Sequence, residues 1–120
     1  MRDATPPLQN GFRRARLLCR LARQIASAFF DVPLVEIERP NRAAAASCEA
    51  RHAAMYLANV VFQIPLVVIA QEFGRDRTSV GHAIRRVEDR RDDPPFDHCL
   101  ERLEALAASC LTLLDETKPE

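Results

Sequence analysis

The sequence has little glycine, no excess of either charge and no long uninterrupted apolar run. Three glycines in 120 residues argue against a protein built from many tight β-hairpins, whose turns need positive φ. Alanine, leucine and arginine dominate instead, and these residues favour helices. The hydrophobic fraction of 48% is enough to form one folded core. The composition therefore predicts a single all-α domain.

The formal net charge of zero excludes a protein that binds nucleic acid through overall positive charge. The charges are nevertheless unevenly distributed. Residues 1–93 carry 15 arginines and 11 acidic residues, whereas residues 94–120 carry two cations and six acidic residues. All the cations except Lys118 are arginine, which suits bidentate contacts with phosphates and bases. A GC-rich genome gives the same bias, so both explanations stay open.

The cysteines form no metal-binding or disulfide pattern. The four residues are Cys19, Cys48, Cys99 and Cys110, and each lies among apolar residues at helical spacing. None forms the CxxC pair of many zinc sites, and neighbours such as His98 and Cys99 point about 100° apart on a helix. We therefore expect buried, reduced thiols in a cytoplasmic protein, with no metal, no cofactor and no cysteine–histidine nucleophile.

The sequence also lacks the features of membrane spans and nucleotide-binding enzymes. Its longest apolar run, residues 60–70, contains Gln63 and Pro65 and is shorter than the ~20 residues that cross a bilayer. There is no GxxxxGK[ST] phosphate-binding loop. We expect a protein that is not an enzyme and that binds neither membranes nor nucleotides.

Apolar residues recur at helical spacing along most of the chain. Residues 1–11, with two prolines and a glycine, predict a flexible leader, followed by one helical domain (12–116) and a short tail (117–120). About six helices are expected, in the ranges 12–30, 31–40, 41–62 after an initial loop, 65–73, 77–91 and 96–116. In the first helix, we expect the apolar face to consist of Leu17, Leu18, Leu21, Ile25, Ala28 and Phe29.

The stretch "EFGRDRTSVGHAIRR", residues 72–86, predicts a helix-turn-helix at about residues 65–91. Gly74 follows a short apolar helix, and Asp76 is a good N-cap for the next helix. On that helix Val80, Ala83, Ile84 and Val87 would point inward, which leaves its first turn polar. The first turn of the second helix in such a motif enters the DNA major groove. An N-capped surface turn with ion-paired arginines explains the same spacing, so the pattern alone leaves both open.

The stretch "EFGRDRTSVGHAIRRVED", with "ARHAAMYLA" upstream, resembles the C-terminal DNA-binding domain of the bacterial replication initiator DnaA. The signature of that family reads approximately FGGRDHTTVLHACRKI after ARQxAMYL, and the resemblance extends from about Leu18 to Leu106. It implies a six-helix fold with a central helix-turn-helix that binds double-stranded DNA. The chain has no room for the ATPase domain of the family.

By position, the resemblance implies a set of DNA contacts. The expected base-reading residues are Arg75, Asp76, Arg77, Thr78, Ser79 and His82. The expected contacts with the DNA backbone or minor groove are Arg42, Arg51, Arg85 and Arg86.

Three departures from the family signature affect these expectations. The double glycine of the family is reduced to Gly74, and Arg77 and Ser79 replace a histidine and a threonine. An arginine at position 77 has the reach to contact a guanine, worth ~1–3 kcal/mol of discrimination. The basic loop of the family is here "NRAAAAS", where only Arg42 is basic. We expect weakened minor-groove reading and a preferred site that differs from the standard initiator box.

The resemblance favours a sequence-specific transcriptional regulator located on the nucleoid in the cytoplasm. Two alternatives stay open: a modulator of replication initiation that competes for origin sites, and a protein-interaction module derived from a DNA-binding domain. The last helix carries an acidic surface and extends past the resemblance. Its apolar side is expected to close the core; the alternative is a surface for a protein partner or a second copy, with Leu111, Leu113 and Leu114 as the candidate contacts.

Overall fold

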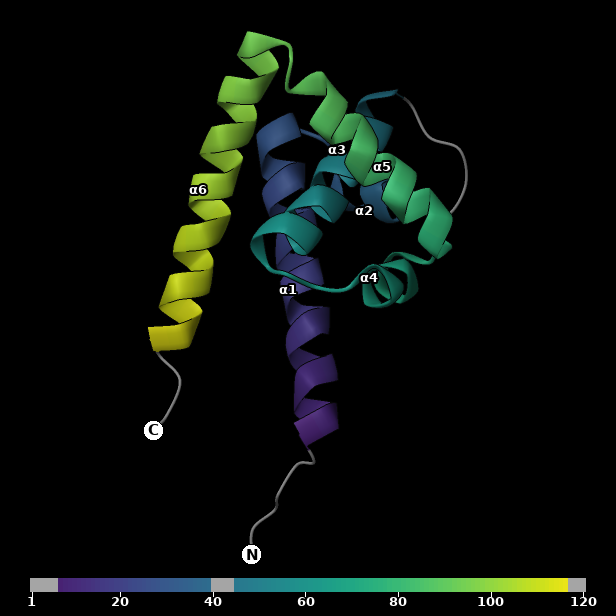
Figure 1. The fold of residues 1–120 in the computed structure, drawn as a ribbon, viewed down its shortest axis with the longest axis vertical. Coiled ribbons are helices and arrows are strands. Elements are labelled where there is room, and N and C mark those ends of the chain that lie inside the picture. The colour runs from purple at the N-terminus through teal and green to yellow at the C-terminus, as the bar shows by residue number, and fades with distance from the viewer. Residues whose placement is uncertain (1–6, 40–44, 117–120) are drawn as a thin grey trace, which may run out of the picture.

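The computed structural model describes residues 7–39 and 45–116, which form six α-helices and no strand within these ranges (Figure 1). The helices are α1 (Pro7–Phe30), α2 (Leu34–Glu38), α3 (Ala45–Tyr56), α4 (Leu66–Phe73), α5 (Arg77–Arg90) and α6 (Pro94–Glu116). A π-helical turn, η1 (Leu57–Val61), continues directly from α3. The all-α prediction is confirmed. None of the described helices is long and apolar enough to span a bilayer.

Helix α3 lies at the centre of the molecule, between α1 on one side and α5 on the other. Its small residues Ala50, Ala53 and Ala54 are buried and permit close approach of both neighbours. The predicted inward-facing residues of α5 are all buried: Val80, Ala83, Ile84 and Val87. Helix α5 is therefore fixed by its inner face, which leaves its outer face available.

The beginning of the chain differs from prediction. Helix α1 begins at Pro7, so residues 7–11 of the predicted leader (1–11) are helical; proline is tolerated in the first turn of a helix. Residues 1–6 and the tail, 117–120, lie outside the described residues. Helix α2 (Leu34–Glu38) is shorter than the predicted range of 31–40, and Pro33 is its N-cap.

The apolar face of α1 is rotated relative to the predicted face. Leu18 and Ile25 are buried as expected, but Leu17 is 54% exposed and Phe29 is 39% exposed, and Ala28 is exposed too. The side that packs against α3 includes the small residues Cys19, Ala22 and Ala26, all fully buried. Small side chains let the two helices approach more closely than leucine and phenylalanine would. This explains why this side of α1, and not the predicted one, packs against α3.

The thiols are also less buried than predicted. Cys19 is fully buried, whereas Cys48, Cys99 and Cys110 are partly exposed; all four are free. Burial raises the pKa of the Cys19 thiol to about 11, so it is protonated and inert. No cluster of three or more potential metal ligands occurs among the described residues.

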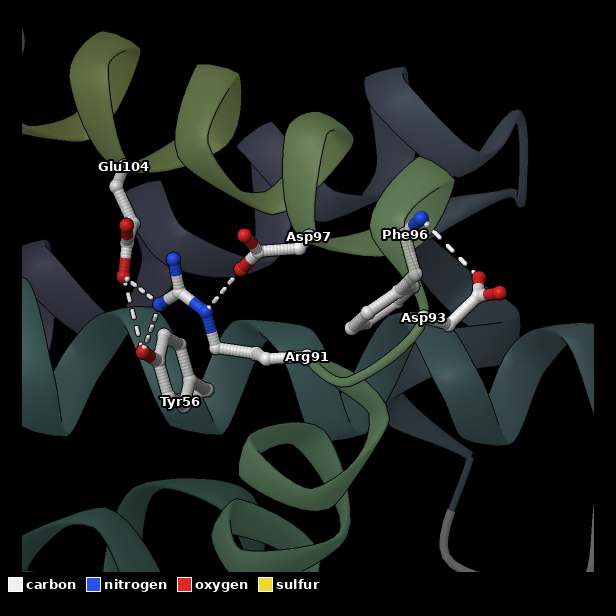
Figure 2. A network of polar contacts seen from close by, with 6 residues as sticks. All are labelled: Tyr56, Arg91, Asp93, Phe96, Asp97 and Glu104. Carbon is white, nitrogen blue, oxygen red and sulfur yellow. Dashed lines mark hydrogen bonds and ion pairs between the residues drawn. The ribbon is translucent and has the colours of Figure 1, made fainter.

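A network of polar side chains joins α6 to the rest of the fold (Figure 2). Arg91, directly after α5, donates hydrogen bonds to Asp97 and to Glu104 of α6, the latter at 2.9 Å. It also donates to the Tyr56 hydroxyl of α3 at 2.7 Å, and that hydroxyl donates to Glu104 at 2.9 Å. The carboxylates raise the pKa of Arg91, which therefore stays charged. Arg91 thus holds α3, α5 and α6 in one arrangement.

Candidate nucleic-acid interface

The candidate site is the first turn of α5 and the turn before it. Gly74 ends α4 in the left-handed conformation, with φ of 65°. The Gly74 amide donates to the Gln71 carbonyl at 3.3 Å and the Arg75 amide to the Ala70 carbonyl at 2.9 Å. These two bonds form a Schellman motif, in which a left-handed residue closes the helix. One glycine is therefore sufficient for the turn, although the family signature has two.

Asp76 is the N-cap of α5, as predicted. Its carboxylate accepts from the Ser79 amide at 2.7 Å and from the Ser79 hydroxyl at 3.2 Å. The bond from the Ser79 amide is the main reason that the pKa of Asp76 is lowered. The cap satisfies a free N–H group of the first turn and fixes the start of the helix in the orientation that the site requires.

The first turn of α5 is exposed. Arg77, Thr78, Ser79 and His82 all lie on the surface, and Arg75 is half-buried. Thr78, His82 and Arg85 follow one another at intervals of four and three residues, which places them on one line opposite the buried Val80, Ala83, Ile84 and Val87. The sequence predicted Arg85 as a contact with the DNA backbone, and the structure places it on this outward line. The 3.6-residue period contained that signal.

Two of the predicted DNA contacts are engaged by the protein itself. Arg51 is only 6% exposed and donates to the carbonyls of Glu36, Ile37 and Arg39, at 3.3, 2.8 and 3.3 Å. It caps the last turn of α2, so its position does not fit the predicted role as a phosphate contact. Arg75 donates to the same Arg39 carbonyl at 3.2 Å. Both guanidinium groups therefore meet at the end of α2, where the free carbonyls attract cations.

Two further arginines of α5, Arg86 and Arg90, lie on the flank that faces α3. Arg86 is exposed and lies close to His52, which is half-buried. Burial lowers the pKa of His52, and Arg86 and Arg51 lower it further. A small cavity in this region is lined by His52, Arg86, Arg90 and Phe96, among others. Arg90 stacks on the Phe96 ring at 3.9 Å from its centroid and pairs with Glu49 at 3.6 Å. Arg42 lies outside the described residues.

The geometry therefore combines a buried anchor, a capped turn and an outward line of polar side chains. The first turn of α5 itself contains no acidic residue, and the residue before it is the capping Asp76. Such a surface has the shape and the donors needed to enter a DNA major groove.

Comparisons with known proteins agree with this arrangement. Residues 21–87 match the family described as bacterial dnaA protein helix-turn-helix. The chain is 32% identical over 105 residues to the chromosomal replication initiator protein DnaA of Symbiobacterium thermophilum, which covers 86% of the chain and 22% of the relative. It is 35% identical over 81 residues to the DnaA of Mycobacteroides abscessus, which covers 64% of the chain and 16% of the relative.

A crystal structure of a DNA replication initiation factor has a TM-score of 0.77 and 32% sequence identity. The similarity covers 85% of this chain and 32% of that one. The chain thus spans about a fifth of the length of the DnaA relatives, and the family match includes the turn and residues 77–87 of α5. This shared region and fold show that the chain belongs to the family of the bacterial DnaA helix-turn-helix domain.

Proposed function

We propose that this chain binds double-stranded DNA in a sequence-specific way through the first turn of α5. The observation that carries the proposal is the exposure of Arg77, Thr78 and His82 on a helix whose inner face is buried. The free N–H groups of a helix N-terminus also favour an approaching phosphate. The family relationship supports the same function.

Each exposed side chain has a proposed contact. Arg77 reaches a guanine O6/N7 pair, and the Thr78 methyl packs on a thymine methyl. His82 and Arg85 continue the line deeper along the groove. Asp76 and Ser79 hydrogen bond to each other, so their main contribution is to fix the turn rather than to read bases. Arg75 has a similar positioning role through its bond to the Arg39 carbonyl.

The proposed contacts with the phosphate backbone are made by Arg86 and Arg42. Arg86 is exposed on the flank of α5, where a phosphate would lie beside His52. Because each phosphate contact releases counterions, removal of Arg86 should weaken binding to all sequences and reduce the salt dependence. Removal of a base-reading residue should instead flatten the sequence preference.

We propose that the chain acts without enzymatic activity, as a transcriptional regulator in the cytoplasm that works by occupying promoter DNA. A second candidate is a modulator of replication initiation that competes for origin sites. One observation favours this alternative: both matched relatives are named chromosomal replication initiator proteins. A genome-wide occupancy map separates the two, because promoters dominate in the first case and origin boxes in the second.

Binding to a random pool of duplexes at low salt tests the proposed function. The expected result is enrichment of one short sequence that differs from the standard initiator box. Arg86→Gln should weaken binding to the selected duplex and to an unrelated duplex by a similar factor. Unchanged mobility with every duplex at low salt would contradict the proposal and favour a protein-interaction module instead.

A further inference from the structure

Helices α1 and α6 lie side by side and run in opposite directions (Figure 1). Each of them exposes leucine side chains. Leu17 is 54% exposed, Leu106 is 52% exposed and Leu113 is 61% exposed. We propose that this surface, named here the α1–α6 face, binds the same face of a second copy of the chain. The proposal is independent of DNA binding.

The contacts of each helix place these leucines on a common side. On α1, Leu18 and Ala22 face the body of the protein, whereas Leu17 lies on the row Arg14–Leu17–Leu21. Arg14 pairs with Asp115 of α6 at 2.8 Å, so this row lies on the α6 side of α1. Leu17 is therefore next to α6 but turned outward.

On α6, the apolar residues that face the body are Leu100, Leu103 and Ala107. Glu104 lies on one flank of this buried stripe, where it meets Tyr56 and Arg91. Leu106 and Leu113 are one heptad apart on the opposite flank, away from α3 and α5. Leu111, by contrast, packs on the core, so it is not part of the α1–α6 face.

The spacing on α6 is typical of a helix that packs against other helices. Cys99, Leu103, Leu106, Cys110 and Leu113 follow at alternating intervals of four and three residues. The core of this copy covers only part of this heptad pattern: Leu103 is buried, whereas Leu106 and Leu113 are exposed. A second helical layer would cover them.

Charge identifies a second copy as the partner and selects its orientation. Within the described residues, the charges of α1 that make no ion pair are those of Arg13 and Arg20. The corresponding charges of α6 are those of Glu101, Arg102 and Glu116, so the unpaired net charge is positive on α1 and negative on α6. A twofold axis parallel to the helices places α1 of one copy against α6 of the other, where the net charges attract. A twofold axis perpendicular to the helices would place α1 against α1, where they repel.

The same symmetry predicts one contact at the rim. The Arg14–Asp115 pair sets these residues at the same height, so in the antiparallel helices Arg13 is level with Glu116. An axis parallel to the helices preserves height, and it brings Arg13 of one copy near Glu116 of the other. Both are exposed, and neither makes an ion pair within residues 7–39 and 45–116.

The size of the face predicts a weak dimer. The two helices overlap for about 17 residues, which gives a face about 25 Å long and about 20 Å wide. Two such faces bury about 1,000 Å² in total, the lower limit for a specific interface. Dimerisation should therefore depend on concentration rather than be permanent.

Sedimentation equilibrium of the full chain, from micromolar to hundreds of micromolar, tests the proposal. The expected mass rises from the 13.5 kDa of one chain towards twice that value. Leu106→Glu with Leu113→Glu should weaken association more than about tenfold, because it places charges inside an apolar contact. Val67→Glu is the matched control: Val67 is 51% exposed on α4 and should leave association unchanged.

A charge swap tests the orientation. Arg13→Glu and Glu116→Arg should each weaken association about threefold, and the double variant should restore it. Far-UV circular dichroism confirms that every variant is folded. A monomer at all concentrations would overturn the proposal, even if the leucines bound a different protein. Equal association by wild type and the double-leucine variant would overturn it as well.

Discussion

At the C-terminal end of α5, Arg91 contacts Asp97, Glu104 and Tyr56, and its side chain is 28% exposed. At the N-terminal end, Arg77 is exposed and makes no hydrogen bond or ion pair within the described part of the chain. The two ends of one helix thus carry arginines with opposite surroundings. An arginine surrounded by protein acceptors holds the fold, whereas one on an exposed turn keeps its donors available for a ligand.

The largest expected effect tests whether Arg51, like Arg91, is an arginine that holds the fold. Arg51→Ala should lower the free energy of unfolding by about 3 kcal/mol, because three carbonyls at the end of α2 lose their buried donor. Urea denaturation measures this effect. The exposed Arg85→Ala is the control, with a change within about 0.5 kcal/mol. Equal stability of the two variants would mean that Arg51 is not structural.

A smaller loss is expected for the arginine at the other end of the helix. Arg91→Ala should lower the free energy of unfolding by about 2 kcal/mol, because Tyr56 and two carboxylates lose a shared donor in a partly exposed site. Urea denaturation followed by tyrosine fluorescence is suitable, since Tyr56 is the single tyrosine. A stability equal to that of wild type would show that the network in Figure 2 contributes nothing.

The cap at the N-terminal end should have a still smaller effect, and one that depends on pH. The folded state lowers the pKa of Asp76, so its stabilisation is present above the unfolded value of ~3.9 and is lost as pH falls through the folded value. Asp76→Ala should lower the melting temperature by a few degrees at neutral pH. The difference from wild type should shrink in acid. A difference that stays constant down to pH ~2 would argue against a role for the charge.

Much of this comparison was predictable from sequence. Gly74 and Asp76 were identified as turn and cap because the local chemistry decides both. The inner face of α5 followed from its period in the same way. The structural role of Arg51 was not predictable, because its hydrogen-bond partners are backbone carbonyls at the end of α2, twelve to fifteen residues away. The exposure of Leu17 was missed for a similar reason, since only the tertiary approach of α3 decides which side of α1 is buried.

The smallest effect on stability and the most specific effect on function are expected at Arg77. The free energy of unfolding of Arg77→Ala should lie within about 0.5 kcal/mol of the wild-type value, because the side chain is exposed and has no partner within the described residues. Its consequence should appear in DNA recognition alone. Urea denaturation of this variant is therefore the control for the measurement that follows.

Selection of binding sites from a random duplex pool, with wild type and Arg77→Ala in parallel, tests the central claim most directly. The account predicts one recurrent site for wild type, and loss of the preference for guanine at a single position in the variant, worth ~1–3 kcal/mol. An identical selected site for both proteins, or no selected site at all, would contradict it.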